Sequence, residues 1–184
     1  MAHASVPEAE AGRKFMVTFE TLFDDVLNST QMTREDQLTR LGLTLPPPPA
    51  PGGNYVSAKR VGSMVYLAGV ISTSSSGPIT GTVGGDSTVD EGYNAARACA
   101  LTQLAVLKRE LGTLDAVTEI ISVNGYVNSV AGFAESPAVI NGASDLLVSV
   151  FGESGKHVRA AVGVSGLPRN AMVEVQMTVR VSAE

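Results

Sequence analysis

Two neighbouring stretches near the end of the chain, KHVRAAVGV (156–164) and MVEVQMTVRV (172–181), decide how the fold is read. In both, apolar residues alternate with period two, which is typical of half-buried strands. If the stretches form a hairpin with their valines on one face, Arg159 lies opposite Gln176 and shares its face with Glu174. The apolar face is then predicted to hold Val158, Ala160, Val162, Val164, Val173, Val175, Met177, Val179 and Val181. The other face carries Arg159 and Glu174 among small residues, which leaves room for a ligand or another subunit.

The composition suits one domain with an extension. Of the 184 residues, 44% are apolar, enough for a core, and only 17% are charged, below the usual quarter or so. Such a surface is expected to be covered, most simply by another copy of the chain. The net charge of −5 argues against nucleic-acid binding, which requires basic patches.

The cysteine content and the hydropathy of the sequence indicate the cellular compartment in which we expect the protein. The single cysteine, Cys99, excludes an internal disulfide or a cysteine-based metal site, so we expect a reducing compartment, the cytoplasm. No apolar run approaches the ~20 residues that span a bilayer, and the first residues lack the pattern of a signal peptide. We therefore expect no membrane partner.

The first part of the chain, residues 1–53, reads as an extension. Residues 1–31 include several apolar side chains and have no assignable role. Thr33-Arg34-Glu35-Asp36 resembles a capping box that opens a short helix ending near Gly42. Residues 45–53, LPPPPAPGG, predict an extended Pro-rich strap.

Residues 54–184 read as an α+β domain of order ββ-α-β-α-ββ. The predicted strands are 54–61, 63–71, 117–127, 156–164 and 172–181, and the predicted helices start at Val89 and near Pro137 and end at Gly112 and Gly152. The apolar run 64–71 predicts a strand covered on both faces, and Gly125 predicts a bulge or the close approach of another backbone. Two helices on one face of a mixed sheet leave the other face for a ring-shaped homo-oligomer.

Several segments together resemble one family. They are NYV (54–56), LAG (67–69), YNAA (93–96), AVIN (138–141), RAAVGV (159–164), LP (167–168) and VEV (173–175). From about Gly42 to Val181 the chain resembles the Rid family of reactive intermediate deaminases, also called the YjgF family, and within it a longer branch. The spacing from Arg159 through Leu-Pro to Val-Glu-Val carries the resemblance most specifically.

The resemblance implies a chorismate-mutase-like subunit in a homotrimer, with three sites in the clefts between subunits. It implies hydrolysis of small 2-aminoacrylate-type enamines or imines to 2-keto acids and ammonia, a hydrolase acting on C–N bonds without metal or organic cofactor. By position, Arg159 would hold the substrate carboxylate and Glu174 would position the attacking water. The further residues that the resemblance places near the cleft are Tyr55, Asn141 and Gly69, the last through its backbone.

The residue chemistry suits these roles. A guanidinium grips a carboxylate bidentately and stays charged at any working pH, and a carboxylate can orient water and transfer protons. His157 lies on the strand face of Arg159 and is expected at the rim of the site. One departure stands out: deaminases of the family usually carry Ser-Gly where this chain has Ala68-Gly69.

The residues leave alternatives open. Arg159 and Glu174 could form a structural ion pair, within the hairpin or across an interface. The protein could be a non-catalytic trimer that binds or senses a small carboxylate. A ribonuclease role, proposed for relatives of the family, conflicts with the acidic net charge.

Overall fold

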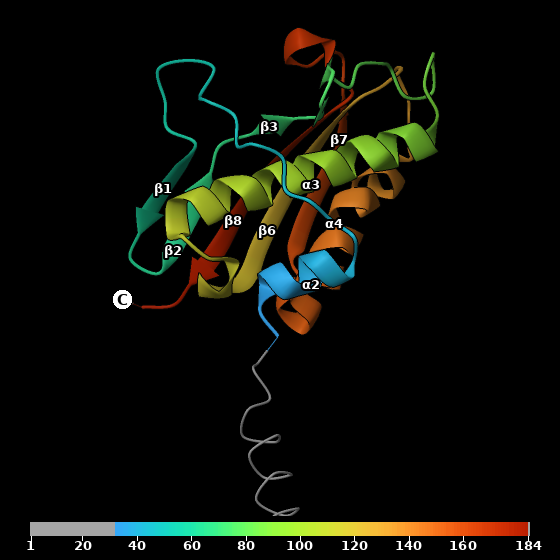
Figure 1. Ribbon diagram of the computed structural model, residues 1–184. Coiled ribbons are helices and arrows are strands. Elements are labelled where there is room, and N and C mark those ends of the chain that lie inside the picture. The colour runs from blue at the N-terminus through green and yellow to red at the C-terminus, as the bar shows by residue number, and fades with distance from the viewer. Residues whose placement is uncertain (1–31, 184) are drawn as a thin grey trace, which may run out of the picture. The chain divides into compact units, whose positions relative to one another are not determined.

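The computed structural model describes residues 32–183, whose helices and strands are labelled in Figure 1. The expectations for residues 1–31 lie outside the described residues. In chain order the elements are α2 (Arg34–Arg40), β1 (Ala58–Val61), β2 (Met64–Leu67), β3 (Val70–Ile71), β4 (Thr73–Ser74), β5 (Gly77–Pro78), α3 (Val89–Leu111), β6 (Val117–Asn128), α4 (Ser136–Phe151), β7 (Val158–Val164) and β8 (Val173–Val181). Short 3-10 turns, η1 (Leu114–Ala116), η2 (Gly152–Gly155) and η3 (Pro168–Asn170), precede β6, β7 and β8.

Helices α2 and α3 begin at the caps that the sequence predicts. At α2 the Thr33 hydroxyl accepts a hydrogen bond from the Asp36 N–H, and the Asp36 carboxylate accepts one from the Thr33 N–H. Thr88 and Glu91 form the same reciprocal pair at α3. Pro137 occupies the first turn of α4, and both long helices end at the predicted glycines. Side-chain capping therefore fixes where α2 and α3 begin.

The sheet contradicts the predicted hairpin. Its order is β1-β2-β8-β6-β7, and β3 also pairs with β8. Strand β7 runs parallel to β6, whereas β8 runs antiparallel to β6 on its other side. Strand β6 therefore lies between the two arms that the sequence placed side by side, and α4 makes the crossover that joins the parallel pair (Figure 1).

The register also overturns the predicted face of β7. Arg159 lies opposite Val123, which lies opposite Met177, so all three share the face that carries the buried core. Glu174 lies opposite Tyr126 on the other face. The outer face thus holds Val158, Ala160, Val162 and Val164, which the sequence placed on the core face. Alternation shows which residues share a face, but it cannot show which face is covered.

The outer face is open in the single chain. Val158 is 71% exposed, Val162 47% and Tyr66 50%. The prediction that the apolar run 64–71 is covered on both faces is therefore wrong for one subunit, since only Val65 and Leu67 of β2 are buried.

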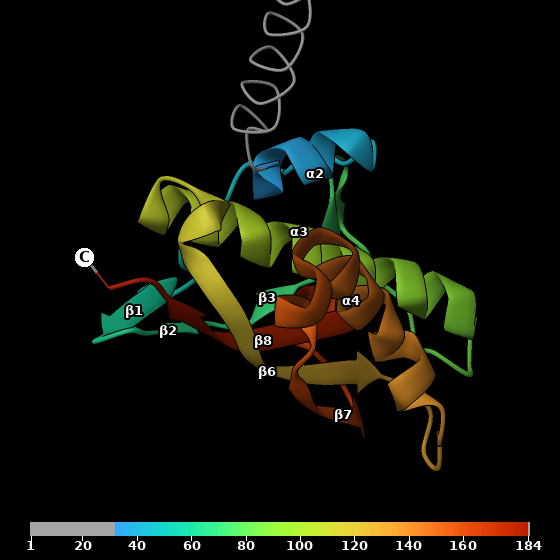
Figure 2. The ribbon, with the colours of Figure 1, turned by 90° about the horizontal axis from the view of Figure 1, so that it is seen from below.

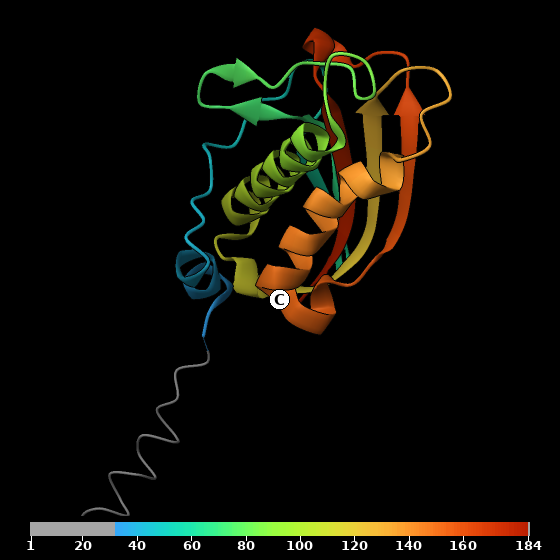
Figure 3. The ribbon, with the colours of Figure 1, turned by 90° about the vertical axis from the view of Figure 1, so that its right-hand side faces the viewer.

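Helices α3 and α4 pack side by side on the core face (Figures 2 and 3). A Cβ placed on Gly142 of α4 would overlap the backbone oxygen of Tyr93 on α3, so glycine allows the two helix backbones to approach closely. The two helices pack against the sheet, and the core consists mainly of side chains from α3, α4, β2, β6 and β8.

Gly125 serves helix packing rather than a bulge. A Cβ at this position would overlap the Ile140 side chain of α4, so the close neighbour is a side chain and not another backbone. The register shifts of β6 lie nearer its start, between Val117 and Glu119 and between Ile120 and Ser122.

The Pro-rich segment crosses over α3 on its way from α2 to β1 (Figure 1). Residues 43–51 contain neither helix nor strand. Leu43 and Leu45 pack against the core, and the Arg109 guanidinium of α3 donates to the Pro49 carbonyl at 3.3 Å. The segment leads to Tyr55 and then into β1.

Candidate functional site

Arg159 reaches from β7 toward α4. Its Nη1 donates to Asn141 Oδ1 at 2.8 Å and to Ser144 Oγ at 3.0 Å. Its Nη2 donates to the Pro137 carbonyl at 3.3 Å. These three acceptors lie along one side of α4 at helical spacing, so a single helix face orients the guanidinium.

The Arg159 guanidinium keeps unused donors. A guanidinium has five N–H groups, and three of them make the bonds above. Within residues 32–183, the Nε–H and one Nη2–H of Arg159 have no hydrogen-bond partner, and the side chain forms no ion pair. Two adjacent donors suit bidentate recognition of a carboxylate. The neighbours of Arg159 on its face of β7 are Ala161 and Gly163, which are small.

Glu174 and Gly69 lie together on the other side of the sheet. A Cβ at Gly69 would overlap Glu174 Oε1, so the carboxyl group lies directly against the Gly69 backbone. Glu174 is half-buried, and burial raises the pKa of its carboxyl group. Within the described part of the chain this carboxyl group has no hydrogen-bond or ion-pair partner, which suits a group that accepts and releases a proton.

Tyr55 closes a tight turn ahead of β1. Its hydroxyl accepts a hydrogen bond from the Gly52 N–H at 3.0 Å, and its ring lies over Gly53. The ring is 52% exposed. Two residues later, the Ser57 carbonyl accepts from the Ala68 N–H at 2.8 Å, which ties this segment to the neighbourhood of Gly69.

The predicted site residues therefore form two groups in one chain. Asn141 lies with Arg159, whereas Gly69 lies with Glu174. An ion pair between Arg159 and Glu174 within the chain, one of the alternatives left open by the sequence, does not form.

Sequence reasoning missed a contact behind Arg159. The oxygen of Ser144 lies 3.0 Å from His157 Nε2, and His157 Nδ1 lies 2.7 Å from the Gly155 carbonyl. His157 is half-buried rather than an open rim residue. One signal in the sequence could have pointed to Ser144. Residues 137, 141 and 144 recur at helical spacing and therefore share one face of the helix.

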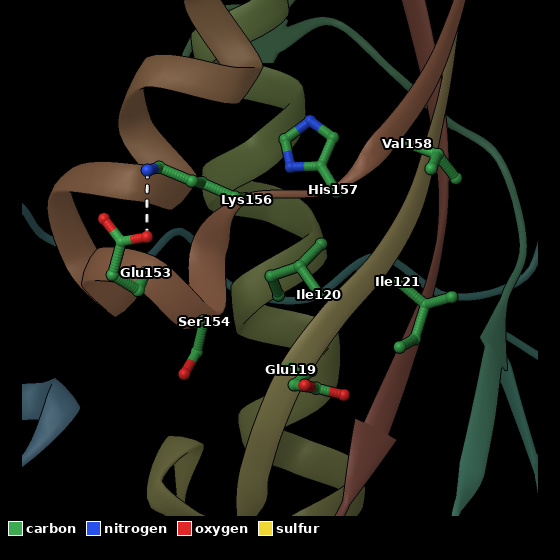
Figure 4. A pocket seen from close by; sticks show the side chains of 8 residues that line it. All are labelled: Glu119, Ile120, Ile121, Glu153, Ser154, Lys156, His157 and Val158. Carbon is green, nitrogen blue, oxygen red and sulfur yellow. Dashed lines mark ion pairs between the residues drawn. The ribbon is translucent and has the colours of Figure 1, made fainter.

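A hollow of about 350 Å³ opens beside His157 (Figure 4). Its lining includes Glu119, Glu153 and Lys156, and the last two form an ion pair at 2.9 Å. A second, polar hollow of about 480 Å³ lies between the loop 80–87 and the side chains of Asn128 and Asn170.

Metal and thiol chemistry find no support in the described residues. Within residues 32–183, no cluster of three or more His, Cys, Asp or Glu side chains could hold a metal ion. Cys99 is fully buried, and burial raises the pKa of its thiol, so it is a core residue rather than a nucleophile. No helix in the same range combines the length and apolar character that crossing a membrane requires.

Comparison with known proteins shows the family to which the chain belongs. Residues 35–181 match the family described as "YjgF/chorismate mutase-like, putative endoribonuclease". Protein TCP17 of Trypanosoma cruzi is 45% identical over 147 residues, which cover 79% of this chain and 92% of that protein.

Two solved structures resemble the chain closely. A protein of unknown function from Agrobacterium tumefaciens is 41% identical, with a TM-score of 0.75, over 81% of this chain and 92% of its own. A "putative endoribonuclease" from Shewanella oneidensis is 34% identical, with a TM-score of 0.77, over 81% of this chain and 99% of its own. These matches confirm the predicted family and its mixed α+β fold.

Proposed function

Because the chain belongs to the YjgF/chorismate-mutase-like family, we propose that it is a cofactor-independent deaminase of small enamine or imine acids. Its substrates are 2-aminoacrylate-type acids, and its products are 2-keto acids and ammonia. The sites lie in the clefts between the subunits of a homotrimer. The observation that carries the proposal is the Arg159 guanidinium, held by α4 with two adjacent donors still unused.

Arg159 holds the substrate carboxylate. The three bonds to α4 fix the plane of the guanidinium before ligand arrives, so little side-chain entropy is lost on binding. Ala161 packs against the core and a Cβ at Gly163 would meet Ser129 Oγ, so the space for the rest of a small substrate comes from the cleft with another subunit. Asn141 supports the same guanidinium nitrogen at 2.8 Å.

Glu174 orients water and transfers protons. Its raised pKa brings its protonation closer to neutral pH, where general acid–base catalysis is most effective. Gly69 allows the carboxyl group to lie against the backbone, and Tyr55 lies on the segment tied to this neighbourhood.

The placement of the two groups supports an inter-subunit site. Strand β6 separates β7 from β8, and Arg159 and Glu174 lie on opposite faces. A site that uses both side chains therefore takes Arg159 from one subunit and Glu174 from another. The open outer face, with Val158, Val162 and Tyr66 exposed, offers the apolar surface on which subunits associate.

The chemistry needs little more than positioning. Protonation of the enamine at the carbon that does not bear nitrogen gives an iminium ion, whose C=N carbon is electrophilic. Water held by Glu174 adds to that carbon and gives its proton to Glu174, which leaves a carbinolamine. Transfer of that proton to the amino nitrogen lets the C–N bond break with its electrons on ammonia, and loss of the hydroxyl proton leaves the keto group. Fixing water and substrate together can replace much of the entropic barrier of a bimolecular reaction.

A second function is favoured by one observation. Ala68 stands where deaminases of the family usually carry serine, so a hydroxyl that would contact substrate or water is absent. Loss of one such contact commonly costs ~1–3 kcal/mol. The alternative is a non-catalytic trimer that binds a small carboxylate on Arg159 and responds to it.

Ammonia release separates the two functions. Generating 2-aminoacrylate and longer-chain imines in solution, and following ammonia with and without protein, should show acceleration by the wild type. Replacing Arg159 with Ala should weaken carboxylate binding by about 1.5–3 kcal/mol, roughly ten- to a hundredfold. A matched control is Arg109→Ala, because Arg109 lies exposed on α3 and, within residues 32–183, its side chain bonds only to Glu110 and the Pro49 carbonyl.

The outcomes are distinct. If the wild type and Arg159→Ala both match the uncatalysed rate but only the wild type binds pyruvate, the protein is the non-catalytic binder. Ala68→Ser should then create or raise turnover. If the wild type neither binds pyruvate nor accelerates hydrolysis, both functions are wrong.

RNA cleavage is a useful additional assay. The name of the Shewanella relative mentions endoribonuclease activity. We expect no RNA cleavage by this chain, because a net charge of −5 disfavours the phosphate contacts on which RNA binding depends.

A further inference from the structure

Behind Arg159 lies a continuous hydrogen-bonded chain of side chains. Arg159 Nη1 donates to Ser144 Oγ at 3.0 Å, and Ser144 Oγ lies 3.0 Å from His157 Nε2. His157 Nδ1 lies 2.7 Å from the Gly155 carbonyl at the end of η2. The chain links the guanidinium on β7 to an imidazole through a single hydroxyl group of α4.

The geometry fixes the direction of each bond. A carbonyl oxygen can only accept, so His157 Nδ1 carries the hydrogen toward Gly155. In the neutral imidazole Nε2 then accepts from the Ser144 hydroxyl. Because the Ser144 hydroxyl hydrogen points toward His157, a lone pair of the Ser144 oxygen is free to accept the hydrogen bond from Arg159.

Arg159 is the charge most directly connected to His157. Burial lowers the pKa of His157, the bond to the Gly155 carbonyl opposes that shift, and the Arg159 charge lowers the pKa further. On the other side, Lys156 and Glu153 pair with each other, and Glu119 of β6 lines the same hollow (Figure 4).

The remaining packed element adds no competing charge at this point. The sole charged side chain of α4 is Asp145, which accepts a hydrogen bond from the Tyr93 hydroxyl at 3.0 Å. An anion that neutralises the charge of Arg159 should therefore raise the pKa of His157.

We propose that Ser144 and His157 are positioning residues of the carboxylate site, so that an anion on Arg159 and a proton on His157 favour each other. The inference rests on the proposed role of Arg159. An anion removes the repulsion between guanidinium and imidazolium, and linkage makes the effect reciprocal.

Protonation need not release Arg159. The Nε2–H of charged His157 donates to Ser144 Oγ, whose two lone pairs then accept from both cations. The hydroxyl hydrogen turns to the Ile140 carbonyl one turn back, a bond that helical serines commonly make. Ser144 thus serves both protonation states of the histidine.

NMR can observe this coupling directly in the full chain. The sequence has two histidines, His3 and His157, so the imidazole signals are simple to assign with a His157→Gln variant. The probe is pyruvate, which stays ionised between pH 5 and 8. Saturating pyruvate should raise the pKa of His157 by roughly half a unit. By reciprocity, pyruvate should bind about threefold more tightly below that pKa than above it.

Three variants separate the contributions. Arg159→Gln should raise the pKa of His157 in the absence of ligand. Ser144→Ala should weaken pyruvate binding several-fold, and Ser144→Thr, which keeps the hydroxyl, should restore it.

The outcomes distinguish this inference from the proposed function. If pyruvate binds and Arg159→Gln abolishes binding, but the pKa of His157 does not move, the coupling is wrong and the carboxylate site stands. If pyruvate binds at no pH and hydrolysis is not accelerated, the proposed function fails. The ligand-free comparison of the wild type with Arg159→Gln then decides the coupling, and an unchanged pKa of His157 overturns it.

Discussion

Arg159 and Glu174 lie on opposite faces of the sheet, with β6 between their strands. In register, Arg159 lies beside Val123 on the core face, whereas Glu174 lies beside Tyr126 on the outer face. Their side chains extend in different directions, one toward α4 and the other against Gly69. One chain therefore cannot offer both groups to one small ligand, and the proposed reaction depends on how subunits associate.

Complementation between inactive variants tests that arrangement. Arg159→Ala and Glu174→Gln should each be inactive alone. When the two are co-expressed with different tags, mixed trimers should recover about a third of the wild-type activity, because each site draws one group from each of two subunits and a mixed ring contains one intact site out of three. Ammonia release by the doubly tagged assemblies measures the recovery. Mixed trimers that remain as inactive as either parent would show that the two groups do not share an inter-subunit site.

Gly69→Ala should reduce turnover while leaving the fold intact. The new Cβ would overlap Glu174 Oε1, and the flexible end of that side chain can move away at little cost in stability, within ~1 kcal/mol. Displaced Glu174 no longer holds water in place, so we expect at least a tenfold loss of activity, within the range of general acid–base effects. Gly166→Ala is the matched control, because no atom lies within 4 Å of its added Cβ. Equal activities of the two variants would exclude Glu174 as the water-positioning group.

Glu174→Gln should stabilise the protein at neutral pH. Burial raises the pKa of Glu174 in the folded chain above its ordinary value of 4.5, so the folded state binds the proton more tightly than the unfolded state. The stabilisation by the protonated form is complete below pH 4.5 and is lost as the pH rises through the higher folded pKa. The variant should therefore have a higher urea midpoint than the wild type at pH 7 and an equal one near pH 4.

A surface control makes this comparison specific. Glu110 forms an exposed ion pair with Arg109 at 2.7 Å, so Glu110→Gln should be neutral or slightly destabilising at pH 7. If the urea midpoint of Glu174→Gln at pH 7 is lower than that of the wild type, the ionised carboxylate stabilises the fold, and the burial argument is wrong.

Gly142→Ala should destabilise the helix pair. The added Cβ would overlap the Tyr93 backbone oxygen, and backbone cannot move aside as a side chain can. Separation of α3 and α4 should cost about 1–3 kcal/mol, which a urea unfolding curve measures directly. Gly166→Ala should change stability by no more than about 0.5 kcal/mol. An unchanged midpoint for Gly142→Ala would mean that the two helices pack less closely than described.

The sequence predicted the local elements. Thr33 and Thr88 open helices because capping is a contact over three residues, and the apolar stripe of residues 89–111 identifies a helix without further information. The mixed α+β fold followed from the order of the predicted strands and helices, and the family followed from the spacing between Arg159 and the VEV segment 173–175. Asn141, which the resemblance placed near the cleft, accepts a hydrogen bond from Arg159, and its role in substrate binding stays a prediction.

Only the tertiary structure decided which strands are neighbours and which faces are covered. Period-two alternation is the same whether β7 pairs with β8 or with β6, so the insertion of β6 and the turn of Arg159 toward α4 were not predictable from the pattern. For the same reason the contact of Ser144 with His157, thirteen residues apart, appeared only when the crossover through α4 brought them together. Local order is encoded by residues that touch along the chain, whereas strand order depends on the burial of the whole core.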